Sequence, residues 1–227
     1  ENCGPTTVEF IEYSYITTYL ARNNGAYDGI NGATGRDIGF QLYGNIFERD
    51  GFNIIRYNIG VFNGSGINSK DHNSSKDFIA RLIVTPFKGF SVSGSYMYAE
   101  TDIKDHNFWN NIRYLKSHRF AVGAWYENGT WIARSEYVHA NFGNICTDSF
   151  YALAGYNFKQ PWSLYARYEF IMDDVSALDR ERIQIGTAYK PFKFLRLQAN
   201  LNYEIDALKP EGHRNSLGFN ILATAMF

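Results

Sequence analysis

One stretch decides the fold class: Leu195-Arg196-Leu197-Gln198-Ala199-Asn200-Leu201-Asn202-Tyr203-Glu204. Its odd-numbered residues are apolar, and its even-numbered residues are polar or charged. Successive side chains of a β-strand point to opposite faces, so this pattern predicts a strand with one apolar face and one wet face.

The same alternation recurs from residue 35 to the end of the chain. Every second connection is short, with turn signals such as Asp50-Gly51 and Asn128-Gly129, and the other connections are long and polar. Short turns at one end and long loops at the other are typical of outer-membrane β-barrels. The run at 148–158 is apolar on both faces, so the pattern does not orient it. We predict eleven strands, at 35–47, 53–63, 77–85, 90–99, 117–126, 131–140, 148–158, 162–171, 182–189, 195–204 and 216–227.

The composition agrees with a transmembrane antiparallel β-barrel. Mean hydropathy is −0.33, and no stretch approaches the roughly 18 apolar residues of a membrane helix. A barrel strand alternates apolar and polar residues, so its average hydropathy stays low. The net charge of −1 and the lack of a basic run argue against nucleic-acid binding. Aromatic residues recur near the ends of the apolar stripes, as in interfacial girdles: Tyr57, Tyr98, Tyr126, Trp131, Trp162, Tyr189 and Phe227.

A soluble β-sandwich or lipocalin-like barrel would show the same alternation, but the strand number, the loop asymmetry and the aromatic Phe227 favour a membrane barrel. Single-chain bacterial barrels have an even number of strands, so eleven strands lead us to expect further strands before residue 1. Cys3 and Cys146 could pair, although two incidental thiols fit two cysteines better.

Three segments resemble the phosphate-selective porin O/P family, in the order of that family's motifs: Val8-Glu9-Phe10-Ile11-Glu12-Tyr13-Ser14, Gly35-Arg36-Asp37-Ile38-Gly39-Phe40-Gln41 and Tyr57-Asn58-Ile59-Gly60-Val61-Phe62-Asn63-Gly64. The resemblance implies a barrel of sixteen strands, often trimeric. It also implies that residues 1–34 are an inward-folded third extracellular loop with a Gly/Asn-rich extension at 23–34. Phosphate specificity is not carried over, because the family's N-terminal strands, with part of its anion-binding arginines, are not in this chain. The constriction residues would be Glu9, Glu12, Tyr13 and Tyr15.

Arginines dominate the charged positions of the predicted wet faces, opposed by Asp37, Glu136, Glu169 and Glu204. A guanidinium stays charged and meets carboxylate or phosphate two-pronged, so such a lumen would attract anions. Arg134 with Glu136 and Arg167 with Glu169 share a face two residues apart, and we expect these pairs to brace the wall. The arginines expected to contact solutes are Arg56, Arg81, Arg119, Arg182 and Arg196.

The sequence thus predicts a porin of a Gram-negative outer membrane that passes small polar or anionic solutes, with phosphate as a candidate. Its expected partners are membrane lipid, those solutes, and copies of itself as a trimer or other outer-membrane proteins; no cofactor or resident metal is expected. The alternative is a structural barrel subunit of a larger outer-membrane complex. We expect no enzyme: the acids Glu9 and Glu12 fit wall contacts better than catalysis, and Ser135 lies about 13 Å along a strand from His139. Asp71, His72 and Asp77 could form a metal-binding loop, but an ordinary solvated loop fits this polar segment better.

Overall fold

The computed structural model describes residues 38–64, 75–102, 114–143, 145–158, 161–174, 179–206 and 215–225. The predicted constriction loop at 1–34 lies outside the described residues, as do Asp37, Asp71, His72 and Phe227. All eleven predicted strands are present, with ends that differ by a few residues. They are β1 (Gly39–Arg49), β2 (Phe52–Phe62), β3 (Asp77–Phe87), β4 (Phe90–Asp102), β5 (Tyr114–Glu127), β6 (Trp131–Phe142), β7 (Ile145–Asn157), β8 (Trp162–Asp173), β9 (Arg180–Phe192), β10 (Leu195–Asp206) and β11 (Ser216–Ala225).

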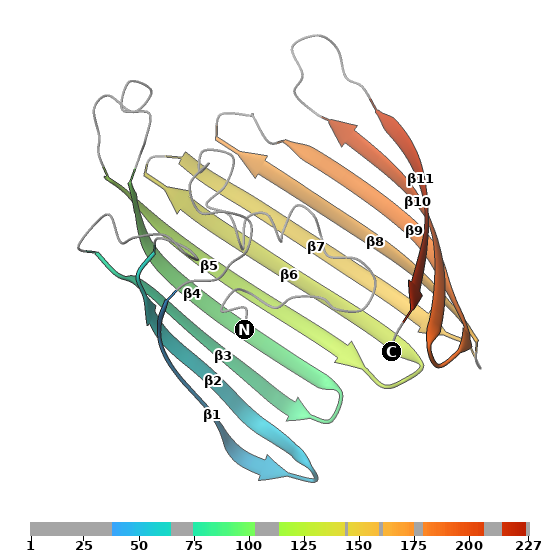
Figure 1. Cartoon of the computed structure of the whole chain (residues 1–227), viewed down its shortest axis with the longest axis horizontal. Helices are drawn as coiled ribbons and strands as arrows, with labels where there is room; N and C mark the ends of the chain where they lie inside the picture. The colour runs from blue at the N-terminus through green and yellow to red at the C-terminus, as the bar shows by residue number, and fades with distance from the viewer. Residues whose placement is uncertain are drawn as a thin grey trace.

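These strands form one antiparallel sheet in which each strand pairs with its neighbours in sequence. Figure 1 shows the sheet strongly curved, with β9, β10 and β11 turned out of the plane of the earlier strands. Among the described strands β1 and β11 are not paired with each other, so they form the two edges of an open barrel wall.

Short turns close the hairpins at one end of the sheet. Asp50 and Gly51 both have positive φ, at 48° and 78°, which is the geometry of the type I′ turn that matches the twist of a hairpin. In the turn after β5, the Asn128 side-chain oxygen accepts hydrogen bonds from the backbone amides of Thr130 and Trp131. The Asp-Gly and Asn-Gly signals are therefore confirmed as turns.

Two prolines lie where the ladder slips by one residue. The pairing of β3 with β4 shifts between Val84 and Phe87, where Pro86 lies, and Pro191 occupies the matching place near the end of β9. Proline has no backbone N–H to donate, so within a sheet it is confined to edges and bulges. Phe87 stacks on Phe90 beside the first of these bulges, with ring centroids 5.2 Å apart. Comparable pairs at the same end of the sheet are Trp131–Tyr156, Trp162–Tyr189 and Phe192–Phe194.

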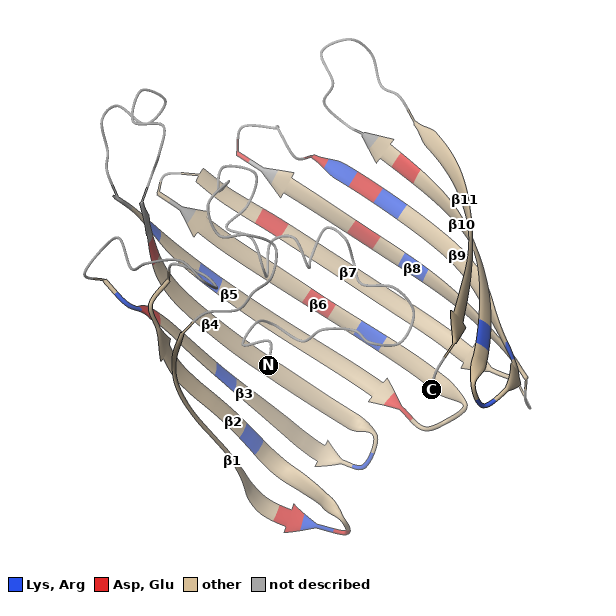
Figure 2. Ribbon diagram, in the orientation of Figure 1, with Lys and Arg blue, Asp and Glu red and all other residues tan. Residues whose placement is uncertain are grey.

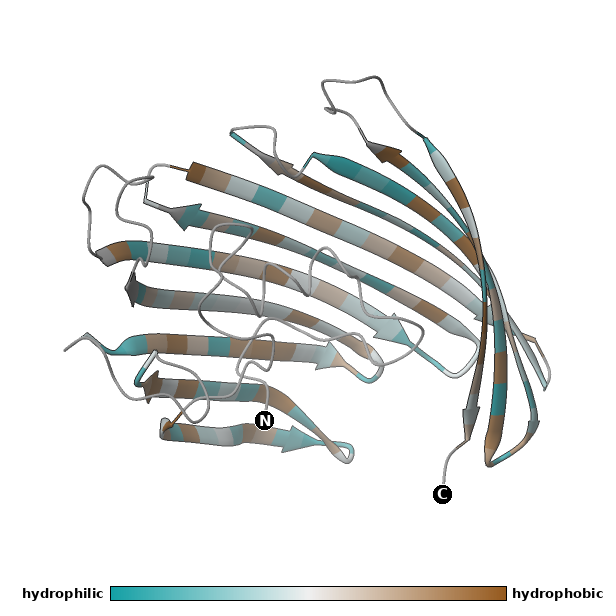
Figure 3. Cartoon of the chain, turned by 45° about the horizontal axis from the view of Figure 1, so that its top comes forward, coloured by the Kyte–Doolittle hydropathy of each residue, from teal (hydrophilic) through white to brown (hydrophobic). Residues whose placement is uncertain are grey.

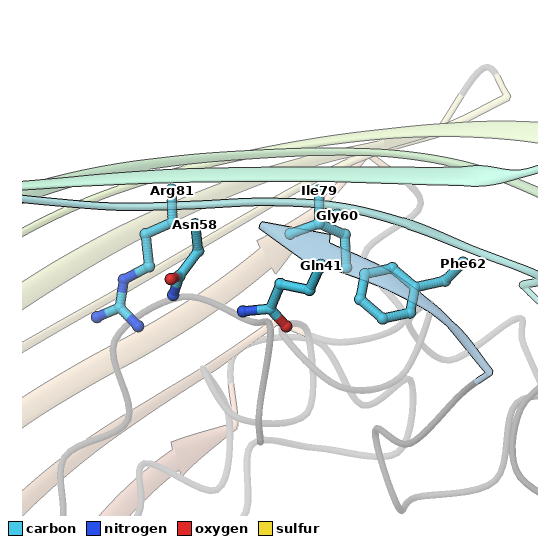
Figure 4. A pocket seen from close by; sticks show the side chains of 6 residues that line it. All are labelled: Gln41, Asn58, Gly60, Phe62, Ile79 and Arg81. Carbon is cyan, nitrogen blue, oxygen red and sulfur yellow. The ribbon is translucent and has the colours of Figure 1, made fainter. Parts of the chain in front are cut away.

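The two faces of the sheet differ as the alternation predicts, and Figure 3 shows the hydropathy bands along the strands. Gln198 and Asn200 are 3% and 1% exposed, whereas Leu197 and Leu201 are 37% and 48% exposed. The polar face is the inner one: Figure 4 shows Arg81 pointing to the side on which later strands lie. Large exposed apolar side chains on the outer face include Phe40, Leu42, Ile59, Val61, Leu82, Val92, Phe120, Val122, Leu164, Ile183, Ile185, Phe219 and Ile221.

Pairing with its neighbours orients β7, which the sequence pattern left open. Tyr151 and Leu153 lie opposite Glu169 and Arg167 of β8 and are 3% exposed, so they face inward. The inner wall therefore carries apolar side chains that the sequence analysis did not assign to it. They form two buried clusters, one of Ile132, Tyr151, Leu153 and Tyr165, the other of Ala121, Val138 and Ile171.

A search of the described residues finds no helix with the length and apolar character needed to cross a membrane.

Candidate functional site: the inner wall of the sheet

A chain of ion pairs crosses the inner wall from β8 to β10. Arg167 Nη2 lies 2.9 Å from Glu169 Oε2, and Arg182 Nη1 lies 3.4 Å from Glu169 Oε1. Arg182 also reaches Glu204, at 3.0 Å. Register explains the chain, because Glu169, Arg182 and Glu204 lie directly opposite one another on adjacent strands. Figure 2 shows the alternating charges on these strands.

Among these ion pairs, the one between Arg167 and Glu169 is the most deeply buried, so breaking it should cost the most stability. The side chains of Arg167 and Glu169 are 3% and 2% exposed, and the Arg167 guanidinium also lies 5.4 Å from the centre of the Tyr151 ring. Arg182 and Glu204 are about a quarter exposed. The expected Arg167–Glu169 pair is thus present. Arg182, expected to contact solutes, is engaged by two carboxylates.

The predicted pairing of Arg134 with Glu136 is wrong. Arg134 Nη2 pairs with Glu127 Oε2 at 3.2 Å. Arg134 lies opposite Trp125, two residues from Glu127, so Glu127 is its diagonal neighbour across the hairpin. Glu136 is 4% exposed and lies between Gly123 and Tyr151 of the adjacent strands.

The remaining predicted arginines lie at different places on the wall. Arg56 is exposed, opposite Ile83, and Arg81 is half-buried, opposite Asn58. Among the described residues neither forms an ion pair. Arg119 is 5% exposed between Met97 and Ala140, and Arg196 is half-buried, opposite Thr224.

Arg81 borders a small hollow, with room for about one water molecule, on the inner face of β1, β2 and β3. Figure 4 shows the six residues that line it. They are Gln41, Asn58, Gly60, Phe62, Ile79 and Arg81.

Sequence reasoning missed several inner-wall charges because it ended the strands too early. Arg180 lies opposite the buried Ile171, and Glu127 ends β5 on the face of Trp125. Extending the period-two pattern by two residues from Arg182 and from Trp125 would have found Arg180 and Glu127.

The outer face carries hydrogen-bonded polar groups toward the long-loop end of the sheet. Asp148 accepts hydrogen bonds from the Tyr137 hydroxyl, at 2.5 Å, and from His139 Nδ1, at 2.7 Å. Tyr96 bonds His118 in the same region, at 3.0 Å. His139 is therefore partnered by Asp148. No group of three metal-binding side chains lies close enough to hold an ion within the described ranges.

Comparison with known families identifies the class of protein to which this sheet belongs. A family model described as Gram-negative porin matches residues 7–223. The chain belongs to the Gram-negative porin family. This porin is accordingly an outer-membrane protein, and the apolar outer face of its strands contacts membrane lipid.

Solved structures agree with the fold of this porin. It is similar to OmpT of Vibrio cholerae with loop L8 deleted, at 17% identity and a TM-score of 0.58, over 98% of this chain and 70% of that one. It is also similar to in-vitro folded OmpT, an outer membrane protein of the same organism, at 17% identity and a TM-score of 0.52, over 82% of this chain and 63% of that one. No curated protein matches the porin.

The exclusion of enzymatic activity does not stand. It rested on the sequence positions of Glu9, Glu12, Ser135 and His139, whereas the similar structures are described only as outer membrane proteins and, at 17% identity, show the fold alone. A barrel wall can carry either a pore or a catalytic site. The expectation of a protein without enzymatic activity is therefore not upheld.

Proposed function

We propose that this porin forms a water-filled pore that passes small polar solutes and prefers anions modestly. The observation that carries the proposal is the unbalanced charge of the inner wall. Arg56 and Arg81 form no ion pair among the described residues, while Glu169, Glu204 and Glu127 are each paired with an arginine. Fixed positive charge in a narrow aqueous channel raises the local concentration of anions.

The reversal potential of the intact protein under a salt gradient tests this function. An anion preference is expected at low salt and should fade as salt rises, because the Debye length falls from about 30 Å at 0.01 M to about 10 Å at 0.1 M. A cation-selective channel would refute the role of the arginines. A silent channel would instead favour a structural subunit of an outer-membrane complex.

The finer resemblance to the phosphate-selective porin O/P family belongs to the same proposal. Its support is the set of three motifs in the sequence, together with the strands from β1 onward, whose polar faces line the inner wall. On this basis the intact protein is a sixteen-stranded barrel, trimeric as many members of that family are, with phosphate among its solutes. Uptake of phosphate into proteoliposomes, compared with uptake of chloride, tests the solute.

We also propose that residues 8–20 fold inward as the constriction. They lie outside the described residues, and the support comes from the sequence. The motif Glu9-Phe10-Ile11-Glu12-Tyr13 lacks strict alternation and resembles the third extracellular loop of that family. Deleting residues 8–20 should raise the conductance of the intact protein if the proposal holds, and an unchanged conductance would contradict it.

A further inference from the structure

Three hydrogen bonds on the outer face of the sheet repeat one arrangement. In each of them a tyrosine hydroxyl meets a polar side chain of the next strand, on the side nearer the long-loop end. The pairs are Tyr96 with His118, at 3.0 Å, Tyr137 with Asp148, at 2.5 Å, and Tyr168 with Glu181, at 3.2 Å. The residues directly opposite the tyrosines are apolar, namely Phe120, Phe150 and Ile183. The tyrosines therefore turn their hydroxyls away from the apolar belt and toward the long loops.

These tyrosines mark the upper edge of the lipid-facing belt. Trp131 lies on the same face of β6 as Tyr137, about 20 Å nearer the short-turn end at about 3.4 Å per residue. With a strand tilt of about 40°, the polar partners of the tyrosines lie about 20 Å above Trp131, close to the upper limit of an apolar band about 25 Å tall. The long loops of such barrels face the outside of the cell. The polar partners thus lie at the level of the outer-leaflet headgroups.

More polar side chains adjoin the first two pairs, on β4 to β7. His139 Nδ1 lies 2.7 Å from Asp148 Oδ1, yet the two side chains remain 37% and 40% exposed. Asn141 lies directly opposite His118, and the ring of Tyr98 lies 5.2 Å from the ring of His118. We call these five residues the outer-face patch.

The chemistry of the outer-face patch suits sugar hydroxyls better than a bare anion. Imidazoles, an amide and a carboxylate supply both donors and acceptors of hydrogen bonds, and a hydroxyl needs both. Anionic headgroups are held instead by clusters of Lys and Arg. Lys116 is the cation nearest in sequence to His118, and it lies directly opposite Glu100. The rings of Tyr98 and His118 add flat apolar surface beside these polar groups.

We propose that the outer-face patch binds the saccharide headgroup of a glycolipid in the outer leaflet. Sugar hydroxyls bond to Asp148, His139 and Asn141, and the face of a sugar ring lies on Tyr98 and His118. The acyl chains of the same lipid continue down the apolar belt, so the patch extends an interface with lipid that the porin already has. This inference does not depend on the pore function, because it concerns the opposite face of the wall.

Native mass spectrometry of the folded intact protein in detergent tests the proposal. The probes are a deep-rough lipopolysaccharide, the same glycolipid after removal of its phosphates, and phosphatidylglycerol. The two glycolipids should bind within about threefold of each other, and phosphatidylglycerol at least about tenfold more weakly. Equal binding of all three would show only a general affinity for lipid. Loss of binding with the phosphates would show a phosphate site, and either result would overturn the proposal.

Asn141→Leu, with Asn53→Leu as its matched control, places the binding on the patch. Both variants put an apolar side chain on the outer face, but Asn53 lies at the short-turn end of β2, on the same face as Ile59. Asn141→Leu should weaken glycolipid binding about fivefold, the loss expected for one hydrogen bond, and Asn53→Leu less than about twofold. Heat-dependent gel mobility shows that each variant is folded.

Two outcomes of this comparison would overturn the proposal. Equal losses in Asn141→Leu and Asn53→Leu would remove the binding from the outer-face patch. An oligomer that excludes the glycolipid and dissociates in Asn141→Leu would show that a second copy of the chain covers this face.

Discussion

Tyr165 lies across Gly186 on the inner wall, and its hydroxyl donates a hydrogen bond to Asn200 one strand further on. Register sets this contact, since Gly186 is opposite both Tyr165 and Asn200. Tyr165 is 2% exposed. The ring occupies the space that a side chain at residue 186 would need.

Gly186→Ala should therefore destabilise the barrel. The added Cβ would collide with Tyr165 and lie 2.5 Å from Asn200 Oδ1, and overpacking of this kind costs about 1–3 kcal/mol. Equilibrium unfolding in urea, followed by tryptophan fluorescence, measures the loss. The control is Gly155→Ala, which is also opposite Tyr165 but whose Cβ would have no neighbour closer than 3.5 Å. Equal losses in both variants would contradict the assignment.

Glu169→Gln should weaken the wall more than Glu204→Gln. Glu169 is 2% exposed and pairs with both Arg167 and Arg182, whereas Glu204 is 27% exposed and pairs with Arg182. Removing one partner of a buried pair leaves an uncompensated charge and costs about 3–5 kcal/mol. Urea unfolding of the two variants side by side checks the order, and a larger loss in Glu204→Gln would refute it.

Arg81→Ala should reduce the preference for anions, because it removes a positive charge that no carboxylate pairs with among the described residues. Arg134→Ala should change selectivity less and should chiefly loosen the hairpin that Arg134 and Glu127 join. Reversal potentials at low and high salt measure selectivity for both variants. Identical shifts at low salt would show that pairing does not distinguish the two arginines.

Leu201→Arg should destabilise the barrel in lipid. Leu201 is 48% exposed on the apolar outer face near the middle of β10, and an arginine facing hydrocarbon at mid-depth costs about 2–4 kcal/mol. Asn202→Arg is the control: it places the same charge one residue away on the inner face, where water is within reach. Folding yields into vesicles should fall for Leu201→Arg only. The reverse order would mean that the faces are misassigned.

Period-two alternation was enough to predict the strands of this porin, the tight turns, and the wet and apolar faces of every strand except β7. Those features depend on residues that are close in sequence. Asp50 and Gly51 form a tight turn because both residues adopt positive φ. Leu197 and Gln198 lie on opposite faces because successive side chains of a strand point in opposite directions. On the inner wall, most charges and the Arg167–Glu169 pair were predictable, but the partners of Arg134 and Arg182 were not.

Only the tertiary structure decided which side chains meet. β7 is apolar on both faces, so its orientation came from pairing with β6 and β8. Arg134 pairs with Glu127 on the other strand of its hairpin, and Arg182 pairs with the carboxylates of Glu169 and Glu204, which lie on the two adjacent strands. The contact of the Phe62 ring with Gly39 likewise needed β1 and β2 in one register. The physical reason is distance. Residues two apart on one strand are separated by about 7 Å, whereas residues opposite each other on paired strands lie about 5 Å apart. The sequence of one strand does not determine the register that brings such opposite residues together.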